Sequence, residues 1–429
     1  MKNKPKLAII GSGIGGLSAA WLLKEQFDVT VFEQQSRPGM GIYTVDYNSN
    51  GKQLRIDIPL RIFCDGYYPN LLALYELLGI EIESTNHCAA FADEQQHLFF
   101  QYTKLAFQDH CIALPKGHSL LSRSAWQIGF SSKRFFKQAK QDLEHEDLSS
   151  ITVKQYLDRY DYHPDFIHGL LLPTLATICT CDYNSILNYP ADLILSYLSC
   201  GVMKQGVVRA AKGVDDIVPR LLKGCNVVSN AKISAIQTYN KQLKLQLGTG
   251  ETHGFEHIVI ATQAQQAALI LDKFPTQQAL LQQVPYEQSS MAVHTDNNIL
   301  PKHHLPLSPV SYLVNPQQQR PCTTVNLSTA MPHFKGHESV FQTWNPQGCA
   351  DYPHTDKLIA QVDFTRPTVT IKSRKAIQTL QKQQGEQDVS SNIWLCGSYM
   401  AERLPLLEAA VDSALQVAEH LGVQAPWKV

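Results

Sequence analysis

The chain has 429 residues, enough for two or three domains with substantial hydrophobic cores. Hydrophobic residues make up 44% of it and charged residues 17%, a balance that excludes a disordered chain. The formal net charge of -1 argues against electrostatic binding of nucleic acid, which needs a concentrated positive field.

The first segment of the chain predicts a β-α-β unit. Lys6–Ile10 has the composition of a short buried strand, Leu17–Gln26 has the periodicity of a helix, and Val29–Glu33 resembles a second strand. Such a unit closes within about thirty residues. Further along, leucines at helical spacing predict a helix over Tyr68–Leu78 that ends at Gly79.

The middle of the chain, from Gly79 to about Ser199, is predicted to be mostly helical, because apolar and basic residues interleave there. A helix is also expected from about Leu406 to Leu421. Short apolar or alternating runs beyond Cys225 predict strands. These expected strands are Val227–Ile236, Leu243–Leu247, His257–Ala261, Ser290–Thr295, Val310–Val314, Thr323–Leu327 and Ile393–Cys396.

A glycine-rich turn follows the first expected strand and opens the first helix. Residues 11–16 read G-S-G-I-G-G, so Gly11, Gly13 and Gly16 form a G-x-G-x-x-G pattern. The first glycine allows a tight turn, the second lets a pyrophosphate approach the backbone, and the third allows close helix–strand packing. The helix N-terminus adds amide donors. The turn therefore predicts a dinucleotide site.

Glu33 ends the second strand, where a carboxylate accepts hydrogen bonds from a ribose diol. The same carboxylate would repel a 2′-phosphate, so NADP is disfavoured, whereas NAD and the adenosine half of FAD remain open. The alternative is a glycine turn beside a surface glutamate. A strand, a helix and an acid in the expected order favour the nucleotide site.

The cysteines and the N-terminus indicate no metal site and no targeting segment. Ten cysteines are scattered without any C-x-x-C pair, which argues against zinc. We expect reduced, mostly buried thiols in a cytoplasmic protein. The N-terminus resembles a signal peptide superficially, but glycines interrupt its apolar stretch. No apolar run is long enough to span a bilayer.

Two further stretches, Gln34–Gly41 and Asn392–Tyr399, carry a family resemblance. The chain resembles the flavin amine oxidase, phytoene desaturase and protoporphyrinogen oxidase superfamily. Within that superfamily it is similar to a bacterial group of FAD-binding amine-oxidase-like proteins, some of which desaturate methylated fatty acyl chains. The resemblance runs nearly end to end and includes Tyr68–Leu71, Ile258–Thr262 and His294–Asp296.

The resemblance implies a site for non-covalent FAD. In this site Gly11, Gly13 and Gly16 would cradle the pyrophosphate, and Glu33 would bind the adenosine ribose. Leu407, at the start of the last helix, would direct its amide at flavin O2, where reduced flavin concentrates negative charge. The other residues implied in the cofactor site are Ile14, Gly15 and Gln34, then Arg37 and Gly39 along the diphosphate and ribityl chain, Ile233 at the adenine, Ala261 near the dinucleotide, and Gly397 at the ribityl phosphate.

The chain departs from the family pattern at several of these positions. Met40 stands where a second glycine is usual, and Ser398 stands where an acid is usual. Alanines replace glycines in the last helix, a change of small for small that we expect to preserve the site. The alanines are Ala409, Ala410 and Ala414.

A further departure concerns Pro59 and Arg61. The wider family usually places a glycine near Pro59, close to the isoalloxazine. Pro59 removes an amide donor there, and Arg61 adds a fixed cation. Arg61 is one candidate catalytic residue, because it could pair with a substrate carboxylate or with flavin charge. The alternative is a structural ion pair.

The expected reaction depends on a lysine that many amine oxidases place at flavin N5. Its position falls near Ser290, and no lysine is present there. This favours dehydrogenation of a carbon chain over amine oxidation. His294 is the other candidate catalytic residue, as an acid–base partner of Asp296, although alternate residues on one strand are more often simply hydrogen bonded.

The expected fold is α/β, with a two-dinucleotide-binding-domain (Rossmann-type) FAD lobe and a mixed α+β substrate lobe. The expected division follows five segments of the chain. Residues 1–60, 201–270 and 385–429 form the FAD lobe, residues 61–200 form a helical part of the substrate lobe, and residues 271–384 form its sheet-containing part.

The leading hypothesis is an FAD-dependent dehydrogenase or desaturase that takes a hydride from an apolar or acyl-chain substrate. An amine or amino-acid oxidase and a non-catalytic flavin-binding protein stay open as alternatives. The expected partner is a small molecule, with lipids included. A helix over Phe130–Lys140 would set Lys133 and Lys137 one turn apart beside two aromatic residues. It could rest on an anionic membrane, but we favour an ordinary packed amphipathic helix.

Overall fold

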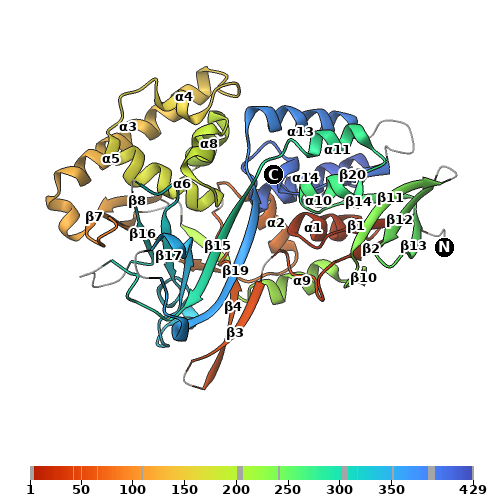
Figure 1. The fold of residues 1–429 in the computed structure, drawn as a ribbon, viewed down its shortest axis with the longest axis horizontal. Coiled ribbons are helices and arrows are strands. Elements are labelled where there is room, and N and C mark those ends of the chain that lie inside the picture. The colour runs from red at the N-terminus through yellow and green to blue at the C-terminus, as the bar shows by residue number, and fades with distance from the viewer. Residues whose placement is uncertain are drawn as a thin grey trace.

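The computed structural model describes residues 4–41, 43–49, 51–64, 66–107, 110–200, 206–239, 242–301, 308–315, 317–349, 352–384 and 392–427. Figure 1 shows two lobes, one built on a parallel sheet and one that combines a large sheet with a group of helices. The long strands β15 (Tyr286–His294) and β19 (Leu358–Pro367) run side by side between them.

A five-stranded parallel sheet forms the core of the first lobe. Its order is β10-β2-β1-β14-β20, and every neighbouring pair is parallel. The carboxyl ends of all five strands therefore meet at one edge, although they come from three distant parts of the chain. The strands are β1 (Lys6–Ile10), β2 (Asp28–Phe32), β10 (Asn226–Val228), β14 (His257–Ile260) and β20 (Ile393–Leu395).

The two faces of this sheet are covered differently, because successive side chains of a strand point to opposite faces. Leu7 and Ile9 pack under α1 (Ile14–Leu23) and α14 (Leu407–His420). Ile10 on the other face packs against α10 (Ala264–Ile270) and a three-stranded antiparallel sheet. That sheet consists of β11 (Ile233–Tyr239), β12 (Gln242–Leu247) and β13 (Thr252–Phe255).

The second lobe is built on an eight-stranded sheet with the order β19-β15-β18-β17-β16-β6-β7-β8. Its helices gather at one end, as Figure 1 shows, and Ile128 of α3 packs on Phe91 and Tyr312 of the sheet. The other strands are β6 (Ala89–Ala92), β7 (Leu98–Phe107), β8 (His110–Pro115), β16 (Val310–Leu313), β17 (Cys322–Asn326) and β18 (Phe341–Trp344). The helices are α3 (Arg123–His145), α4 (Val153–Leu157), α5 (Pro164–Phe166), α6 (Leu172–Cys179), α7 (Tyr183–Asn188) and α8 (Ala191–Ser199).

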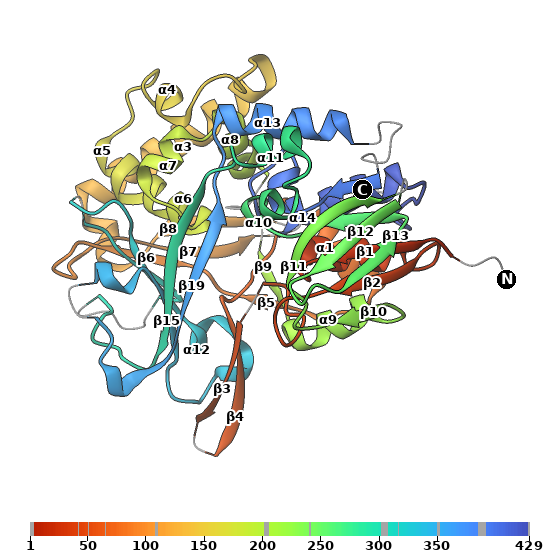
Figure 2. The same ribbon diagram turned by 45° about the vertical axis from the view of Figure 1, so that its right-hand side comes forward.

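Short elements connect the lobes. The hairpin of β3 (Tyr43–Ser49) and β4 (Lys52–Ile58) projects from the molecule in Figure 2, and Ile56 packs at its base against Val293 of β15. The remaining elements are β5 (Ile82–Thr85), which pairs with β9 (Val207–Ala210), and the helices α2 (Pro69–Leu77), α9 (Val214–Leu222), α11 (Pro275–Leu281), α12 (Leu327–Ala330) and α13 (Ile371–Gln383).

The predicted α/β fold with a Rossmann-type lobe and a mixed lobe is confirmed. The helical prediction for the region after Gly79 is wrong between residues 82 and 115, where strands β5 to β8 form. Aromatic and threonine residues in Leu98–Phe107 favour a strand once neighbouring strands pair with it. The predicted strand Val227–Ile236 is two strands, β10 and β11, which belong to different sheets. The five-segment division of the chain stays a prediction.

The expectation of reduced thiols needs one correction. Cys322 and Cys349 form a disulfide, with their Cα atoms 5.9 Å apart. They are 27 residues apart in sequence and meet only because β17 and the segment after β18 lie together, so spacing gave no sign of the pair. None of the helices in the described ranges is both long and apolar enough to cross a membrane.

Gly16→Ala should destabilise the protein by at least about 2 kcal/mol, because the added Cβ would lie 2.2 Å from the carbonyl oxygen of Gly11. The free energy of unfolding from urea titration measures the effect. Gly129→Ala is the matched control: it lies inside α3, its Cβ would have nothing within 4 Å, and it should stabilise by about 0.5–1 kcal/mol. Equal effects of the two substitutions would contradict the close packing at Gly16.

Candidate functional site

The glycine turn lies at the carboxyl edge of the parallel sheet, held by backbone contacts. The amide of Gly11 donates to Phe32 O at 2.8 Å, and the amide of Ala261 donates to Ile10 O at 2.8 Å. Gly11 has φ +102°, and a Cβ there would lie 2.9 Å from Ala261 O. A Cβ on Gly16 would also lie 2.9 Å from Ala261 Cβ. The turn thus joins β1, β14 and α1 with no room for larger residues.

Gly13 differs from the glycines on either side, because its position is open. Its φ is -63°, which any residue adopts, and a Cβ would meet only Ala261 O at 3.9 Å. Gly13 is also the N-cap of α1, and the first amides of a helix have no partner within it. These amides, from Ile14, Gly15 and Gly16, form a donor set suited to a phosphate.

Glu33 lies at the end of β2 beside this turn, with its carboxylate held in place. The side chain is buried and accepts hydrogen bonds from the amide of Ser12 at 3.1 Å and from the amide of Gln35 at 2.8 Å. The hydroxyl of Ser12 donates to the same carboxylate. A carboxylate offers about four acceptor positions, so Glu33 keeps acceptor capacity for a diol. Gln34 lies in an exposed bend next to it.

Gly397 brings the last strand of the sheet to the same edge. Its φ is +142°, a Cβ would lie 3.1 Å from the ring of Tyr399, and its amide donates to Ser413 Oγ at 2.9 Å. A Cβ on Gly15 would lie 3.1 Å from Cys396 Sγ and 3.2 Å from Ala410 O. Small residues on both helices therefore let α1 and α14 begin side by side at this edge.

The start of α14 is fixed by a residue that the sequence analysis missed. Glu408 is fully buried, and its carboxylate accepts the amides of Asn70 at 2.8 Å and Leu71 at 2.9 Å in the first turn of α2. Burial raises the pKa of Glu408 to about 7. Leu407, the first residue of α14, is half-buried beside it. An acid in the first turn of a helix was the signal available in the sequence, but its target on α2 was not.

The predicted cofactor-site residues just before the β3–β4 hairpin do not all lie against the glycine turn. The Met40 amide donates to Ser12 O at 3.1 Å, so Met40 lies against the glycine turn, with Gly39 half-buried before it. Arg37 is 58% exposed, donates to the Thr44 hydroxyl and forms a 3.8 Å ion pair with Asp215. Its guanidinium therefore points toward α9 in this structure.

Ile233 begins β11 near the end of β2. The backbone links the two elements, because the Ala231 amide donates to Glu33 O at 2.8 Å and the Glu33 amide donates to Val228 O at 2.9 Å. Ile233 is buried and pairs with Leu247 of β12. The structure therefore brings Ile233 to the same edge as Glu33.

The two candidate catalytic residues have different surroundings. Arg61 makes no hydrogen bond or ion pair with any residue that the structure describes, and its buried Nε has no partner. His294 is fully buried in β15, with Nε2 2.8 Å from Thr343 Oγ1 and Nδ1 accepting the Asp296 amide at 3.2 Å. Burial lowers the pKa of His294 to about 4. These contacts favour the hydrogen-bonding interpretation of His294 over catalysis.

Asp296 is likewise held by local contacts. It accepts amides from Asn298 at 3.1 Å and His354 at 3.0 Å, and it lies 3.8 Å from Lys357 Nζ. Its pKa is lowered, because these hydrogen bonds and cations together outweigh the largest single effect, burial, which acts in the opposite direction. No group of three or more His, Cys, Asp or Glu side chains in the described ranges could hold a metal ion.

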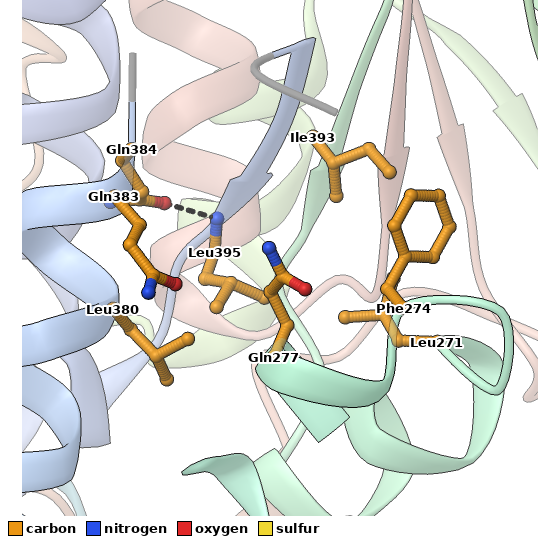
Figure 3. A pocket seen from close by; sticks show the side chains of 8 residues that line it. All are labelled: Leu271, Phe274, Gln277, Leu380, Gln383, Gln384, Ile393 and Leu395. Atoms are coloured by element: carbon orange, nitrogen blue, oxygen red, sulfur yellow. Dashed lines mark hydrogen bonds between the residues drawn. The ribbon is translucent and has the colours of Figure 1, made fainter. Parts of the chain in front are cut away.

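Two hollows in the structure differ in their volume and in the elements that line them. A crevice of about 40 Å³ lies among α11, α13 and β20, where Gln384 Oε1 accepts the Leu395 amide (Figure 3). It is far smaller than the roughly 300–1,000 Å³ of small-molecule sites. An opening of about 670 Å³ lies along β15 and β19 and includes Ser290, Asp363 and Thr365. Thr365 O, at this opening, accepts a hydrogen bond from Gln263 Nε2 at 2.8 Å, and Gln263 lies three residues beyond the end of β14.

Comparisons with known proteins agree with this architecture. A family model described as an NAD(P)-binding Rossmann-like domain matches residues 9–78. A protein of Exiguobacterium sp. 255-15 assigned as a protoporphyrinogen oxidase is 15% identical with a TM-score of 0.66, over 98% of this chain and 100% of that one. The chain shares its fold. No curated protein sequence gives a match.

Two further solved structures have the same fold. Cyclohexylamine oxidase from Brevibacterium oxydans IH-35A is 14% identical with a TM-score of 0.64, over 98% of this chain and 100% of that one. A fatty acid isomerase from P. acnes is 12% identical with a TM-score of 0.63, over 99% and 100%. The fold that the predicted resemblance implies is confirmed by these structures.

Glu408 should make the stability depend on pH. Its pKa in the folded protein, about 7, lies above its ordinary value of 4.5, so the folded state binds more protons within that window. Stability should therefore fall by up to about 3 kcal/mol as pH rises from 4.5 to 7. Urea unfolding at several pH values measures this fall.

Glu408→Gln is the matched variant, because glutamine resembles the protonated acid and still offers one carbonyl acceptor to α2. It should lack most of the fall in stability between pH 4.5 and 7. A variant whose pH dependence matched that of the unchanged protein would remove Glu408 as the source.

Proposed function

We propose that this protein is an FAD-dependent oxidoreductase that takes a hydride from an apolar or acyl-chain substrate. One observation carries the proposal: three groups suited to a dinucleotide lie at one edge of the parallel sheet. They are the first amides of α1 beside the open position of Gly13, the carboxylate of Glu33 and the backbone of Gly397. Amides at a helix N-terminus suit a diphosphate, and a carboxylate suits a ribose diol. The residues present therefore fit the dinucleotide half of FAD.

The comparisons support an oxidoreductase, because two of the proteins with this fold carry the names protoporphyrinogen oxidase and cyclohexylamine oxidase. A bound flavin would accept the hydride from an activated C–H bond. The chain's own contribution would be to hold the cofactor with the glycine turn and Glu33. The first amides of α14, beginning at Leu407, would supply positive charge near flavin O2.

We propose that FAD is held without a covalent bond. Cys396, which directly precedes Gly397, is fully buried between β20 and α14, with its Sγ 3.3 Å from Ser413 Oγ. Burial raises the pKa of this thiol to about 12, so it is poorly suited to form a thioether.

The proposal for the substrate rests on Ser290, which lies near the position where many amine oxidases have a lysine. Ser290 of β15 is buried, and its hydroxyl donates to Gln347 Oε1 at 2.9 Å. Neither group is a base that would deprotonate a substrate ammonium at neutral pH. Dehydrogenation between carbon atoms makes no such demand, and we therefore favour it over amine oxidation.

Contact of α3 with a lipid surface is not part of this proposal. Phe135 of this helix is buried in the core, as an ordinary packed helix requires. Phe130 is 68% exposed and its ring lies 6.0 Å from that of Trp126, while Lys133 and Lys137 are exposed. We favour the packed interpretation for the middle of α3 and assign no membrane role to its exposed end.

Gly13→Val should give folded protein that binds no FAD. The valine side chain would occupy the space next to the α1 amides, where the diphosphate would bind. The fold itself has room for this side chain, and the backbone φ at residue 13 is unstrained. Flavin absorbance after purification and after incubation with FAD measures binding, and circular dichroism checks folding.

Gly254→Val is the matched control, because Gly254 lies in β13 of the same lobe with nothing within 4 Å of its Cβ. It should purify with the same flavin content as the unchanged protein. A yellow Gly13→Val protein with full flavin content would remove the glycine turn from the site.

Anaerobic mixing with a panel of fatty acids, isoprenoids and amines should bleach the flavin absorbance only with a carbon-chain substrate. The reason is that no lysine stands at the Ser290 position to support amine oxidation. Hydrogen peroxide production with the amines would instead indicate the amine oxidase alternative. Bound FAD that no compound in a broad panel reduces would indicate a non-catalytic flavin-binding protein.

A further inference from the structure

A hydrogen-bond network lies where the first turns of α2 and α14 meet, and Asn70 is at its centre. Asn70 is the second residue of α2, and its backbone amide donates to Glu408 Oε1 of α14 at 2.8 Å. Its side-chain Nδ2 donates to Asp412 Oδ1 of α14 at 2.8 Å, and its Oδ1 accepts the indole Nε1–H of Trp427 at 2.9 Å. One residue thus joins α2, α14 and the C-terminal segment.

Asn70 belongs to Tyr68–Leu71, a stretch that carries part of the family resemblance, although none of its residues is among those implied in the cofactor site. The amides of Asn70 and Leu71 both donate to the Glu408 carboxylate, at 2.8 and 2.9 Å. These amides belong to the first turn of α2 and have no acceptor within that helix. The stretch therefore provides a contact between α2 and α14.

This contact determines the charge at the start of α14. The first amides of a helix carry partial positive charge, and a free carboxylate beside them would cancel it. Glu408 is the second residue of α14, yet its carboxylate is bonded to the α2 amides, which stabilise its negative charge. The first amides of α14 therefore keep their positive charge for a group at the carboxyl edge of the parallel sheet.

Asp412, about one turn further along α14, holds the segment that leads into the helix. Its Oδ2 lies 2.7 Å from Nε of Arg403, and the Arg403 guanidinium lies 5.6 Å from the centre of the Tyr67 ring. The hydroxyl of Tyr67 accepts the Leu404 amide at 3.1 Å. The segment between Gly397 and α14 is thus held by Asp412 on one side and by Tyr67 on the other.

Trp427 extends the network to the end of the chain. Its ring centre lies 6.1 Å from that of Trp21 in α1, and both rings are half-buried. Since α1 begins at the glycine turn and α14 follows Gly397, Trp427 contacts both α1 and the Asn70 network that holds α14. These are the two helices whose first amides face the proposed cofactor site.

We propose that Asn70 is a positioning residue for the flavin, and that Trp427 supports it. Asn70 acts through Glu408 and Asp412, so that the first amides of α14 keep their place and their positive charge beside flavin O2. Reduced flavin concentrates negative charge there, so correctly placed amides favour the reduced form over the oxidised form. This inference rests on the proposed function.

Asn70→Ala removes the side-chain bonds to Asp412 and Trp427, and it should lower the midpoint potential of bound FAD by about 30 mV. For a two-electron couple this shift corresponds to about tenfold weaker stabilisation of the reduced flavin relative to the oxidised flavin. An anaerobic titration against a reference dye measures the potential. An unchanged potential would overturn the proposal.

Asn345→Ala is the matched control, because Asn345 lies in the other lobe and also uses its side chain twice. Its Nδ2 donates to Pro321 O at 3.2 Å, and its Oδ1 accepts the Ser289 hydroxyl at 3.0 Å. Both asparagines are half-buried. Both alanine variants should lower Tm, but Asn345→Ala should leave the midpoint potential unchanged. Equal shifts of the potential in the two variants would indicate general loosening of the fold and would overturn the proposal.

Trp427→Phe keeps an aromatic ring beside Trp21 and removes only the indole donor. It should lower the midpoint potential by about 15 mV, which corresponds to about a threefold change, and it provides a test if Asn70→Ala does not fold. A potential equal to that of the unchanged protein would remove Trp427 and its bond to Asn70 from the proposal and overturn it.

A double substitution tests the contact between Asn70 and Asp412 directly. Asn70→Asp places a carboxylate against that of Asp412, so it should lower the potential more than Asn70→Ala does. Adding Asp412→Asn restores a donor and an acceptor at this contact and should recover part of the shift. Absence of any recovery would overturn the proposal.

The same measurements separate this inference from the proposed function. A chain that binds no FAD at all would overturn both of them. Full FAD binding together with an unchanged midpoint potential in Asn70→Ala would overturn this inference alone.

Discussion

The first turn of α1 packs directly on the backbone of the turn that precedes it. Gly16 leaves no space for a side chain above Gly11 O, and Ala261 of β14 closes the contact from the other side. This approach fixes the direction of α1 across the sheet. Gly15 then allows α14 to lie against α1 at Ala410. Because both helices begin at the carboxyl edge, their free amides face the region into which Glu33 and Gly397 also project. The candidate site is thus a consequence of close backbone packing, and larger side chains would displace it.

Buried charges in this molecule have two kinds of surroundings, and the difference separates structure from function. Glu33 and Glu408 are buried acids whose oxygens accept two or more backbone hydrogen bonds, so each joins elements of the fold. Arg61 Nε and Arg366 Nη2 are buried atoms that have no partner among the residues that the structure describes. A folded chain tolerates an unsatisfied charge only where another requirement retains it.

Polar side chains, and not only apolar contacts, join the two lobes at that junction. Gln342 of β18 bonds to the backbone on both sides of Pro59, and Gln263 bonds to β19. A side-chain amide offers donor and acceptor with a defined direction, so it sets the register of one segment against another more narrowly than an apolar contact does. The position of Arg61 relative to the nucleotide lobe therefore depends on residues more than 200 positions later in the chain.

The sequence by itself determined the β-α-β unit, the glycine turn, the acid at Glu33 and the final strand and helix, because these depend on local periodicity and turn chemistry. It also identified Arg61 as a cation and Pro59 as a departure from the family pattern. Only the tertiary structure decided that strands form between residues 82 and 115, that Cys322 meets Cys349, and that His294 bonds to Thr343. Each of these is a meeting of segments far apart in the chain, and such meetings are set by packing of the whole fold, which no local pattern records.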